Sequence, residues 1–182
     1  MLRYVMALTL LALGALAFSQ YSPKAGETVM RLNLAGGGQI DILLHTKEAP
    51  KATAQVIGLA QRGFYDGQRF FRVVKKPRPF LIQFGDPGSK TKPMDDKTLG
   101  EGGSGSSVDY EDSGFPNVAG AVGLATKKDD KDSGDSQFYI LLSDSRFLNG
   151  SATVFGKVVS SMADLNKIAL GDKVTSVTIV RG

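Results

Sequence analysis

Cysteine is absent from this chain of 182 residues, and histidine occurs only once, as His45. Without cysteine the chain has no disulfide bridges, thiolate zinc sites, cysteine nucleophiles or iron–sulfur clusters. One histidine leaves almost no scope for a histidine-rich metal site or a Ser-His-Asp triad. We therefore expect neither a metal nor a cofactor.

The chain also lacks a strong excess of charge of one sign. It has 22 Lys and Arg residues against 18 Asp and Glu residues, a net charge of +4. Such a mixed surface is weak support for nucleic-acid binding, and we expect no nucleic-acid partner. Hydrophobic residues make up 42% and charged residues 22% of the chain, which is typical of soluble proteins and excludes a disordered, collagen-like or polytopic membrane chain. The length fits one domain. We expect the protein to be a monomer.

The first 20 residues have the pattern of a secretory signal peptide. Arg3 precedes an apolar stretch from Val5 to Phe18, which ends in the small-residue pattern around Ala15 and Ala17. Cleavage after Ala17 would leave a chain that begins at Phe18 and folds as a domain over 21–182. This protein would be exported to the periplasm or outside the cell and free of the membrane. The alternative is an uncleaved membrane anchor, although the stretch is shorter than the ~20 residues of a typical spanning helix.

From Tyr21 onward the hydrophobic pattern mostly has a period of two residues, which predicts β-strands. Two segments, 50–62 and 162–170, have a helical period instead. Because strands and helices do not alternate regularly, the pattern of about eight strands and two helices favours a mainly β fold, a closed antiparallel barrel, over a doubly wound sheet. The predicted strands cover 28–35, 39–45, 69–74, 80–84, 118–125, 137–142, 153–158 and 174–180.

Two long segments between strands lack hydrophobic periodicity. Residues 88–117 predict a functional surface loop, and the glycine- and serine-rich run at 100–105 predicts flexibility within it. Residues 127–135 are highly charged and predict a mobile loop. The four aspartates in this second loop do not have the spacing of an EF-hand, so no calcium site is expected.

Arg72 stands out because it lies within an apolar strand segment. It is either structural, with a buried carboxylate partner, or functional. Its neighbourhood and four later blocks resemble, in order and spacing, the cyclophilin family of peptidyl-prolyl cis-trans isomerases. The blocks are 70–74, 80–87, 135–140, 147–150 and 154–158, and the resemblance runs from about Val29 to Val180.

The resemblance implies an eight-stranded closed antiparallel β-barrel capped by two α-helices. It also implies an enzyme that isomerises X-Pro bonds in proline-containing polypeptides, either folding or exported proteins. It places the catalytic arginine at Arg72. It implies substrate binding by Phe80, Leu81, Gln83, Ala125, Gln137, Tyr139, Phe147 and Leu148. The alternative is a noncatalytic peptide-binding or chaperone module that uses the same groove.

The chain departs from the family pattern at several positions. Phe71 and Ala152 replace histidines, Tyr139 replaces a phenylalanine, and Phe147 replaces the tryptophan associated with cyclosporin binding. Thr126 replaces an asparagine, and the turn at 75–79 is enlarged. The last two changes keep the noncatalytic alternative open.

Overall fold

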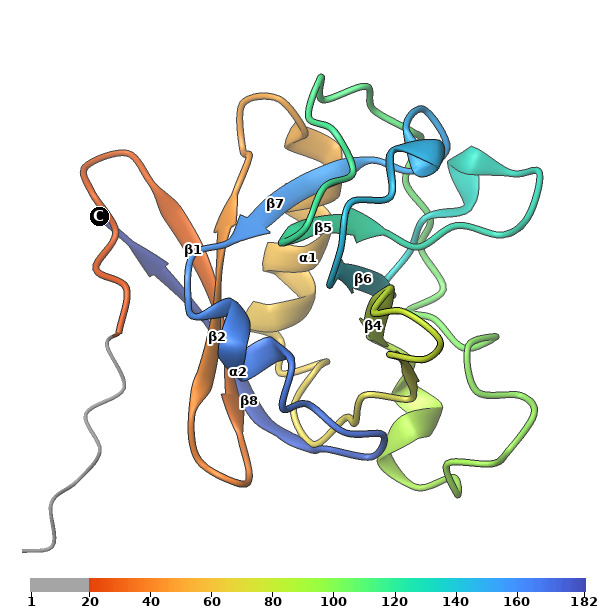
Figure 1. The fold of residues 1–182 in the computed structure, drawn as a ribbon. Helices are drawn as coiled ribbons and strands as arrows, with labels where there is room; N and C mark the ends of the chain where they lie inside the picture. Colours follow the sequence, from red (N-terminus) through yellow and green to blue (C-terminus); the bar gives the residue numbers. More distant parts are fainter. Residues whose placement is uncertain (1–19) are drawn as a thin grey trace, which may run out of the picture.

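Eight β-strands form one curled antiparallel sheet in the computed structural model, which describes residues 20–182 (Figure 1). The sheet order is β3-β4-β6-β5-β7-β2-β1-β8. The predicted signal peptide and its cleavage site lie outside the described residues, apart from Gln20. Among residues 20–182, no helix is both long enough and apolar enough to cross a bilayer. The strands are β1 (Thr28–Leu34), β2 (Gln39–Leu44), β3 (Arg72–Val74), β4 (Leu81–Phe84), β5 (Ala121–Leu124), β6 (Phe138–Leu141), β7 (Val154–Val158) and β8 (Val174–Arg181).

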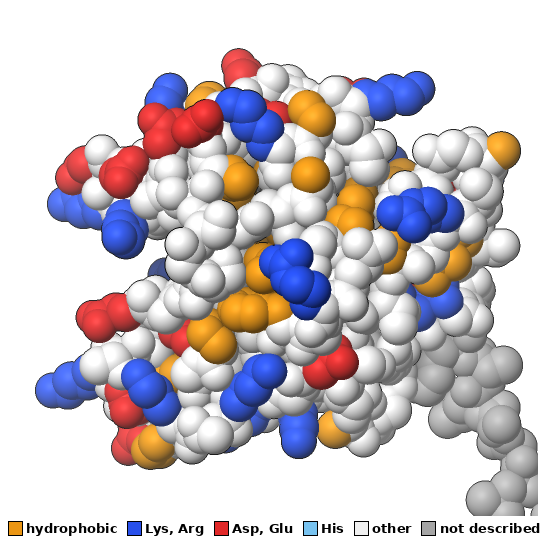
Figure 2. Space-filling view, turned by 180° about the vertical axis from the view of Figure 1, so that it is seen from behind, with side chains coloured by type: hydrophobic (Ala, Val, Ile, Leu, Met, Phe, Trp, Pro, Cys, Tyr) orange, Lys and Arg blue, Asp and Glu red, His pale blue; other side chains and the backbone are white. Residues whose placement is uncertain are grey.

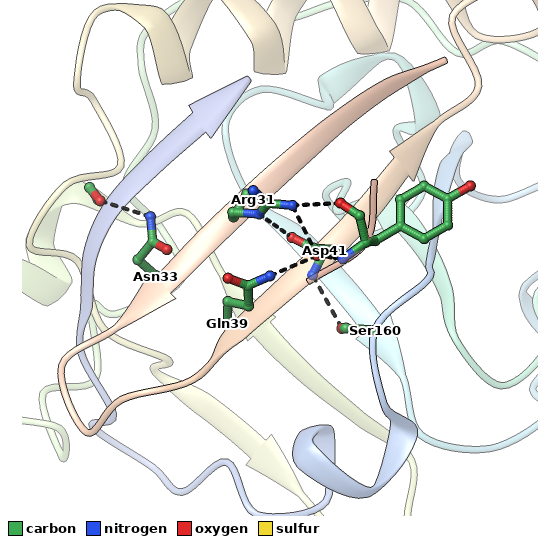
Figure 3. A network of polar contacts seen from close by, with 7 residues as sticks. Arg31, Asn33, Gln39, Asp41 and Ser160 are labelled. Carbon is green, nitrogen blue, oxygen red and sulfur yellow. Dashed lines mark hydrogen bonds and ion pairs between the residues drawn. The ribbon is translucent and has the colours of Figure 1, made fainter. Parts of the chain in front are cut away.

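The sheet begins with the predicted hairpin of β1 and β2. Within this hairpin, Arg31 lies opposite Asp41, and both side chains are buried. Arg31 Nε donates to Asp41 Oδ1 at 2.7 Å, while the backbone N–H of Tyr21 donates to Asp41 Oδ2 at 3.0 Å. Arg31 Nη2 also donates to the Tyr21 carbonyl at 2.8 Å (Figure 3). This buried pair therefore holds the segment before β1 against the sheet.

The two ends of the curled sheet approach each other through loop segments. Residues 67–70 exchange four backbone hydrogen bonds with residues 171–174, including Phe70 N–H to the Asp172 carbonyl at 3.0 Å and Val174 N–H to the Gln68 carbonyl at 2.9 Å. The predicted strand at 69–74 is accordingly shorter, because its first residues make these bonds outside the regular ladder. The predicted eight-stranded antiparallel architecture with two helices is confirmed. The sheet is curled into a half-barrel, and its edge strands β3 and β8 meet through these loop bonds and not through the regular ladder of a fully closed barrel.

Helix α1 (Pro50–Gln61) occupies nearly the predicted segment. Proline stands in its first turn, where a missing N–H costs nothing. Its apolar stripe, which includes Val56 and Leu59, packs into the main hydrophobic core. In Figure 1, α1 lies between the β1–β2 hairpin and strands β4 and β6.

Helix α2 (Met162–Leu165) is shorter than the predicted 162–170. The Ser161 side chain accepts a hydrogen bond from the Ala163 N–H and starts the helix. Lys75 Nζ donates to the carbonyls of Asn166 and Ile168 at 2.6 and 2.5 Å. These carbonyls are therefore satisfied by a lysine from another part of the chain instead of by further helical turns.

The sheet separates two hydrophobic clusters. Cross-strand neighbours share a face, so Ile82, Ile140 and Val122 point together into the main core. Leu81 and Leu141, one position along the same strands, point to the opposite face and belong to a second, smaller cluster. This outer cluster is the candidate site.

Candidate functional site

Arg72 lies at the start of β3 with an exposed side chain. It pairs with Gln83 on β4 in the strand register, and its Nη1 donates to Gln83 Oε1 at 3.1 Å. The ion pairs among the described residues do not include Arg72. The alternative that Arg72 is structural, with a buried carboxylate partner, is therefore wrong, and most of its donors are free to meet a ligand.

Two glutamine amides continue from Arg72 along the outer face. Gln83 Nε2 donates to Gln137 Oε1 at 2.9 Å. Gln137 Nε2 in turn donates to the carbonyls of Gly100 and Gly102 at 2.8 and 2.6 Å. The structure thus brings the predicted residues Arg72, Gln83 and Gln137 into one hydrogen-bonded line.

The predicted apolar residues also come together. Leu81 and Tyr139 are buried in the outer cluster, and Phe80, Ala125 and Leu148 pack against it while partly exposed. Other members are Val74, Ala121, Leu141, Ala152 and Val154. This arrangement provides an apolar surface, partly open to solvent, on the strands that also carry Arg72 and Gln83. We call this surface the outer-face pocket, with the buried Tyr139 as its floor.

Phe147 lies at the rim of this surface. Its side chain is 77% exposed, and its ring is stacked on Phe80 with centroids 5.8 Å apart. It comes from the short 3-10 helix η3 (Arg146–Leu148), which also supplies Leu148. A large exposed aromatic next to a pocket is available for contact with a bound molecule.

Tyr139 forms the floor of the pocket and is only 6% exposed. Its hydroxyl donates to Asn117 Oδ1 at 2.6 Å, and burial raises the pKa of this hydroxyl well above its ordinary value. Its ring crosses β5 at Gly123, where a Cβ would lie 2.2 Å from the ring Cζ and from the hydroxyl oxygen. Glycine at this position is therefore what leaves room for a tyrosine.

Asn117 is a site residue that the sequence did not reveal. Besides accepting from Tyr139, it donates from its backbone N–H and its side-chain amide to Asn149 Oδ1 at 2.8 and 3.3 Å. It thereby connects the pocket floor to the residue that follows Leu148. Only the fold brings these positions together, so no local motif could have marked them.

An open cavity of about 800 Å³ adjoins the site. Gln83, Ala125 and Gln137 line it together with residues of the two loops at 100–107 and 126–135. These loops lie at the right of Figure 1, and the cavity opens as the notch at the left edge of the reversed view in Figure 2. Charged side chains of both signs stand on its rims.

The enlarged turn at 75–79 is fastened at both ends. Lys75 bonds to the end of α2, as described above, and the hydroxyl of Ser143 donates to the Pro79 carbonyl at 2.6 Å. Thr126, which replaces the family's asparagine, has a long contact of 3.4 Å from its hydroxyl to the Ser151 carbonyl.

No group of three or more His, Asp or Glu side chains arranged to hold a metal is found between residues 20 and 182.

The chain has the cyclophilin fold, in which eight antiparallel strands form one curled sheet with two helices. The outer face of its sheet carries the apolar pocket, next to an arginine and two glutamine amides. Crystal structures bear out the fold. A Cryptosporidium parvum cyclophilin type peptidyl-prolyl cis-trans isomerase has a TM-score of 0.71 and 24% identity, over 86% of this chain and 99% of that one. The cyclophilin AquaCyp293 of Hirschia baltica has a TM-score of 0.66 and 20% identity, over 84% and 76%.

Sequence comparison assigns the family. The family model described as "Cyclophilin type peptidyl-prolyl cis-trans isomerase/CLD" matches residues 29–181. The chain is 35% identical over 170 residues to a Brucella suis protein named "Probable peptidyl-prolyl cis-trans isomerase", covering 92% of this chain and 83% of that protein. It is 34% identical over 146 residues to peptidyl-prolyl cis-trans isomerase B of Bacillus subtilis, covering 80% and 94%. The chain therefore belongs to the cyclophilin-type peptidyl-prolyl cis-trans isomerases, which makes it an enzyme of that activity.

Proposed function

We propose that this isomerase acts on X-Pro bonds of exported polypeptides, with Arg72 as its catalytic residue and the outer-face pocket as its proline site. The observation that carries the proposal is the exposed Arg72 guanidinium, free of any ion pair among the described residues and held beside an apolar pocket by one bond to Gln83.

The chemistry requires no nucleophile, base or metal. Rotation about the peptide bond passes a barrier of about 18–20 kcal/mol, because the twisted amide loses its resonance. The prolyl nitrogen then becomes more amine-like and can accept a hydrogen bond. A fixed donor near that nitrogen stabilises the twisted state more than the planar one, and this difference is catalysis. The guanidinium of Arg72 is permanently charged and offers several donors in a planar fork.

The neighbouring residues would hold the substrate while it turns. Phe80, Leu81 and Leu148 would surround the proline ring, above the floor formed by Tyr139. Gln83 and Gln137 each retain an amide hydrogen or lone pair beyond the bonds already described, which suits them to the backbone next to the proline. The apolar wall lowers the local dielectric and so strengthens the contact from Arg72.

Export is supported by the pattern of residues 1–20, with the membrane anchor as the competing possibility. Mass spectrometry of protein from its native host should find an N-terminus near Phe18. Recovery of intact Met1 in the membrane fraction would overturn export as a free protein.

The experiment that tests the site measures cis-trans exchange in a proline peptide alongside thermal unfolding. Loss of one preorganised donor typically lowers turnover by about a hundredfold to a thousandfold, which is the loss expected for Arg72→Ala. Since Arg72 is exposed, Tm should remain close to that of the wild type. Arg72→Lys should recover little activity, because an ammonium lacks the planar fork.

Arg62→Ala is the matched control, because Arg62 ends α1 and lies outside the pocket. It should keep full activity. An active Arg72→Ala variant would show that Arg72 is not the catalytic residue. A wild type that binds proline peptides without accelerating exchange would instead favour the noncatalytic peptide-binding module.

A further inference from the structure

The glycine-rich run at 100–105 is wrapped around two carboxylates. Asp86 is 1% exposed and accepts three backbone hydrogen bonds: Gly88 N–H at 2.7 Å, Gly100 N–H at 2.6 Å and Gly102 N–H at 3.2 Å. Asp135 accepts from the Ser104 hydroxyl and from Gly105 N–H. The segment predicted to be flexible is therefore fastened at two separate points.

Of these two carboxylates, only Asp86 is connected to the catalytic arginine by a continuous series of hydrogen bonds. Asp86 fixes Gly100 and Gly102, whose carbonyls receive both bonds from the Gln137 amide. Gln137 Oε1 accepts a hydrogen bond from the Gln83 amide nitrogen, and Gln83 Oε1 accepts one from Arg72 Nη1. An unbroken series of hydrogen-bonded residues thus runs from a buried carboxylate to the exposed guanidinium.

The two ends of this series determine the orientation of both amides. Arginine can only donate, so the Gln83 oxygen must face Arg72 and its nitrogen must face Gln137. Gln137 must then turn its oxygen to Gln83 and its nitrogen to the loop carbonyls. If the loop carbonyls moved away, the Gln137 amide would lose both acceptors and could rotate, and Gln83 would lose the partner that orients it.

We infer that Asp86 is a positioning residue for catalysis, acting on Arg72 through the loop carbonyls and the two glutamines. Its carboxylate has no basic side chain within ion-pair distance among residues 20–182, and its negative charge is met by backbone N–H groups alone. It therefore sets the position of the loop backbone directly. This inference depends on the proposed catalytic role of Arg72.

The glycine at 102 has a corresponding role. A Cβ there would lie 2.4 Å from Asp86 Oδ1, so any side chain at this position would push the loop off the carboxylate. Its backbone φ lies outside the left-handed region, and alanine is conformationally acceptable. Gly102→Ala therefore disturbs the same contact while leaving Asp86 in place.

The test compares kcat/KM for proline-peptide isomerisation in a set of variants of the full domain. Asp86→Asn has the same shape but presents an NH₂ group to backbone donors. Asp66→Asn is the matched control, because Asp66 also accepts a backbone N–H from a distant segment, that of Val177 at 2.9 Å, and has no bond to this series. Small misplacements of a catalytic group can cost on the order of a hundredfold, so Asp86→Asn should lower kcat/KM by about tenfold to a hundredfold. Asp66→Asn should stay within about twofold of the wild type, because no member of the series is positioned by its carboxylate.

A double-mutant cycle separates positioning from general damage. With Arg72→Ala already present, Asp86→Asn should cause almost no further loss, because the group that it positions is gone. Full additivity of the two losses would overturn the inference, as would wild-type kcat/KM for a folded Asp86→Asn variant. If Asp86→Asn does not fold, Gly102→Ala takes its place in the same cycle with the same two outcomes.

The same series distinguishes this inference from the proposed function. An inactive wild type, or an Arg72→Ala variant with full activity, would refute the proposed site itself. Activity that depends on Arg72 but not on Asp86 or Gly102 would refute only the positioning role.

Discussion

Replacing Gly123 by alanine should disrupt the pocket through Tyr139. The new Cβ would lie 2.2 Å from Cζ and from the hydroxyl oxygen, and 2.8 Å from Cε1. The backbone at Gly123 cannot retreat easily, because it is paired with Tyr139 of β6 on one side and Val154 of β7 on the other. The tyrosine ring must therefore leave its place.

The energetic cost has two sources. Forcing an extra methyl into a packed site costs about 1–3 kcal/mol. Moving the hydroxyl away leaves the buried Asn117 oxygen without its 2.6 Å donor, at a further cost of about 1–3 kcal/mol. The displaced ring would also enter the space beside Leu81 and Leu148, so peptide KM should rise by about tenfold, equivalent to about 1.4 kcal/mol of binding.

The assay combines urea unfolding with isomerisation kinetics. Gly36→Ala is the control, because a Cβ there meets nothing within 4 Å and its φ is outside the left-handed region. It should be neutral. In a Tyr139→Leu background, Gly123→Ala should cost far less than in the wild type, because the clashing ring is absent. A Gly123→Ala variant with wild-type stability and KM would refute this account of the pocket floor.

Three further predictions concern other parts of the molecule. Phe147→Trp should tighten cyclosporin inhibition by about 1–3 kcal/mol, since it adds an indole donor and aromatic area at the exposed rim; equal inhibition of the wild type and the variant would contradict this. Asp41→Ala should lower the free energy of unfolding by about 3–5 kcal/mol in denaturant titrations, because it leaves Arg31 buried and unpaired, whereas Lys167→Ala on the exposed Asp164 pair should change it by less than about 1 kcal/mol. Burial lowers the pKa of His45; Lys157 acts in the same direction and Glu48 acts against it. The unfolded state therefore binds the proton more readily, and the free energy of unfolding should fall as the pH drops below about 6.5. His45→Phe should keep the stacking on Phe115 and flatten that dependence between about pH 5 and 7, measured as Tm against pH; an unchanged slope would assign it to other groups.

Much of the fold was predictable because strand alternation records which side of a sheet each residue faces. The segments at β1, β2 and α1 matched to within a few residues. The short α2 was not predictable, since its end depends on Lys75, a residue far away in the chain. The fastening of the glycine-rich run was also missed, because a composition rich in glycine gives no sign of distant carboxylates such as Asp86.

The candidate site, too, was only partly predictable from the sequence. Arg72 stood out in the sequence as an arginine within an apolar strand, whereas Gln83 and Gln137 were predicted only from the resemblance to a family. The structure adds that the three residues share hydrogen bonds. The links from Tyr139 to Gly123 and Asn117 depend on strand register and on a long loop. Neither is visible in a sequence that is read locally.

The placement of the two hydrophobic clusters on opposite faces of one sheet has a consequence for how this enzyme can change. Residues such as Val74, Ala125 and Leu148 contact the outer cluster and contribute nothing to the main core. Their replacement alters the shape offered to a peptide while the interior remains intact, so new peptide preferences can be selected at little cost to folding. Tyr139 is the exception, because its hydroxyl is anchored beneath the surface. A library intended to diversify selectivity should therefore vary the rim and the walls and leave the floor unchanged.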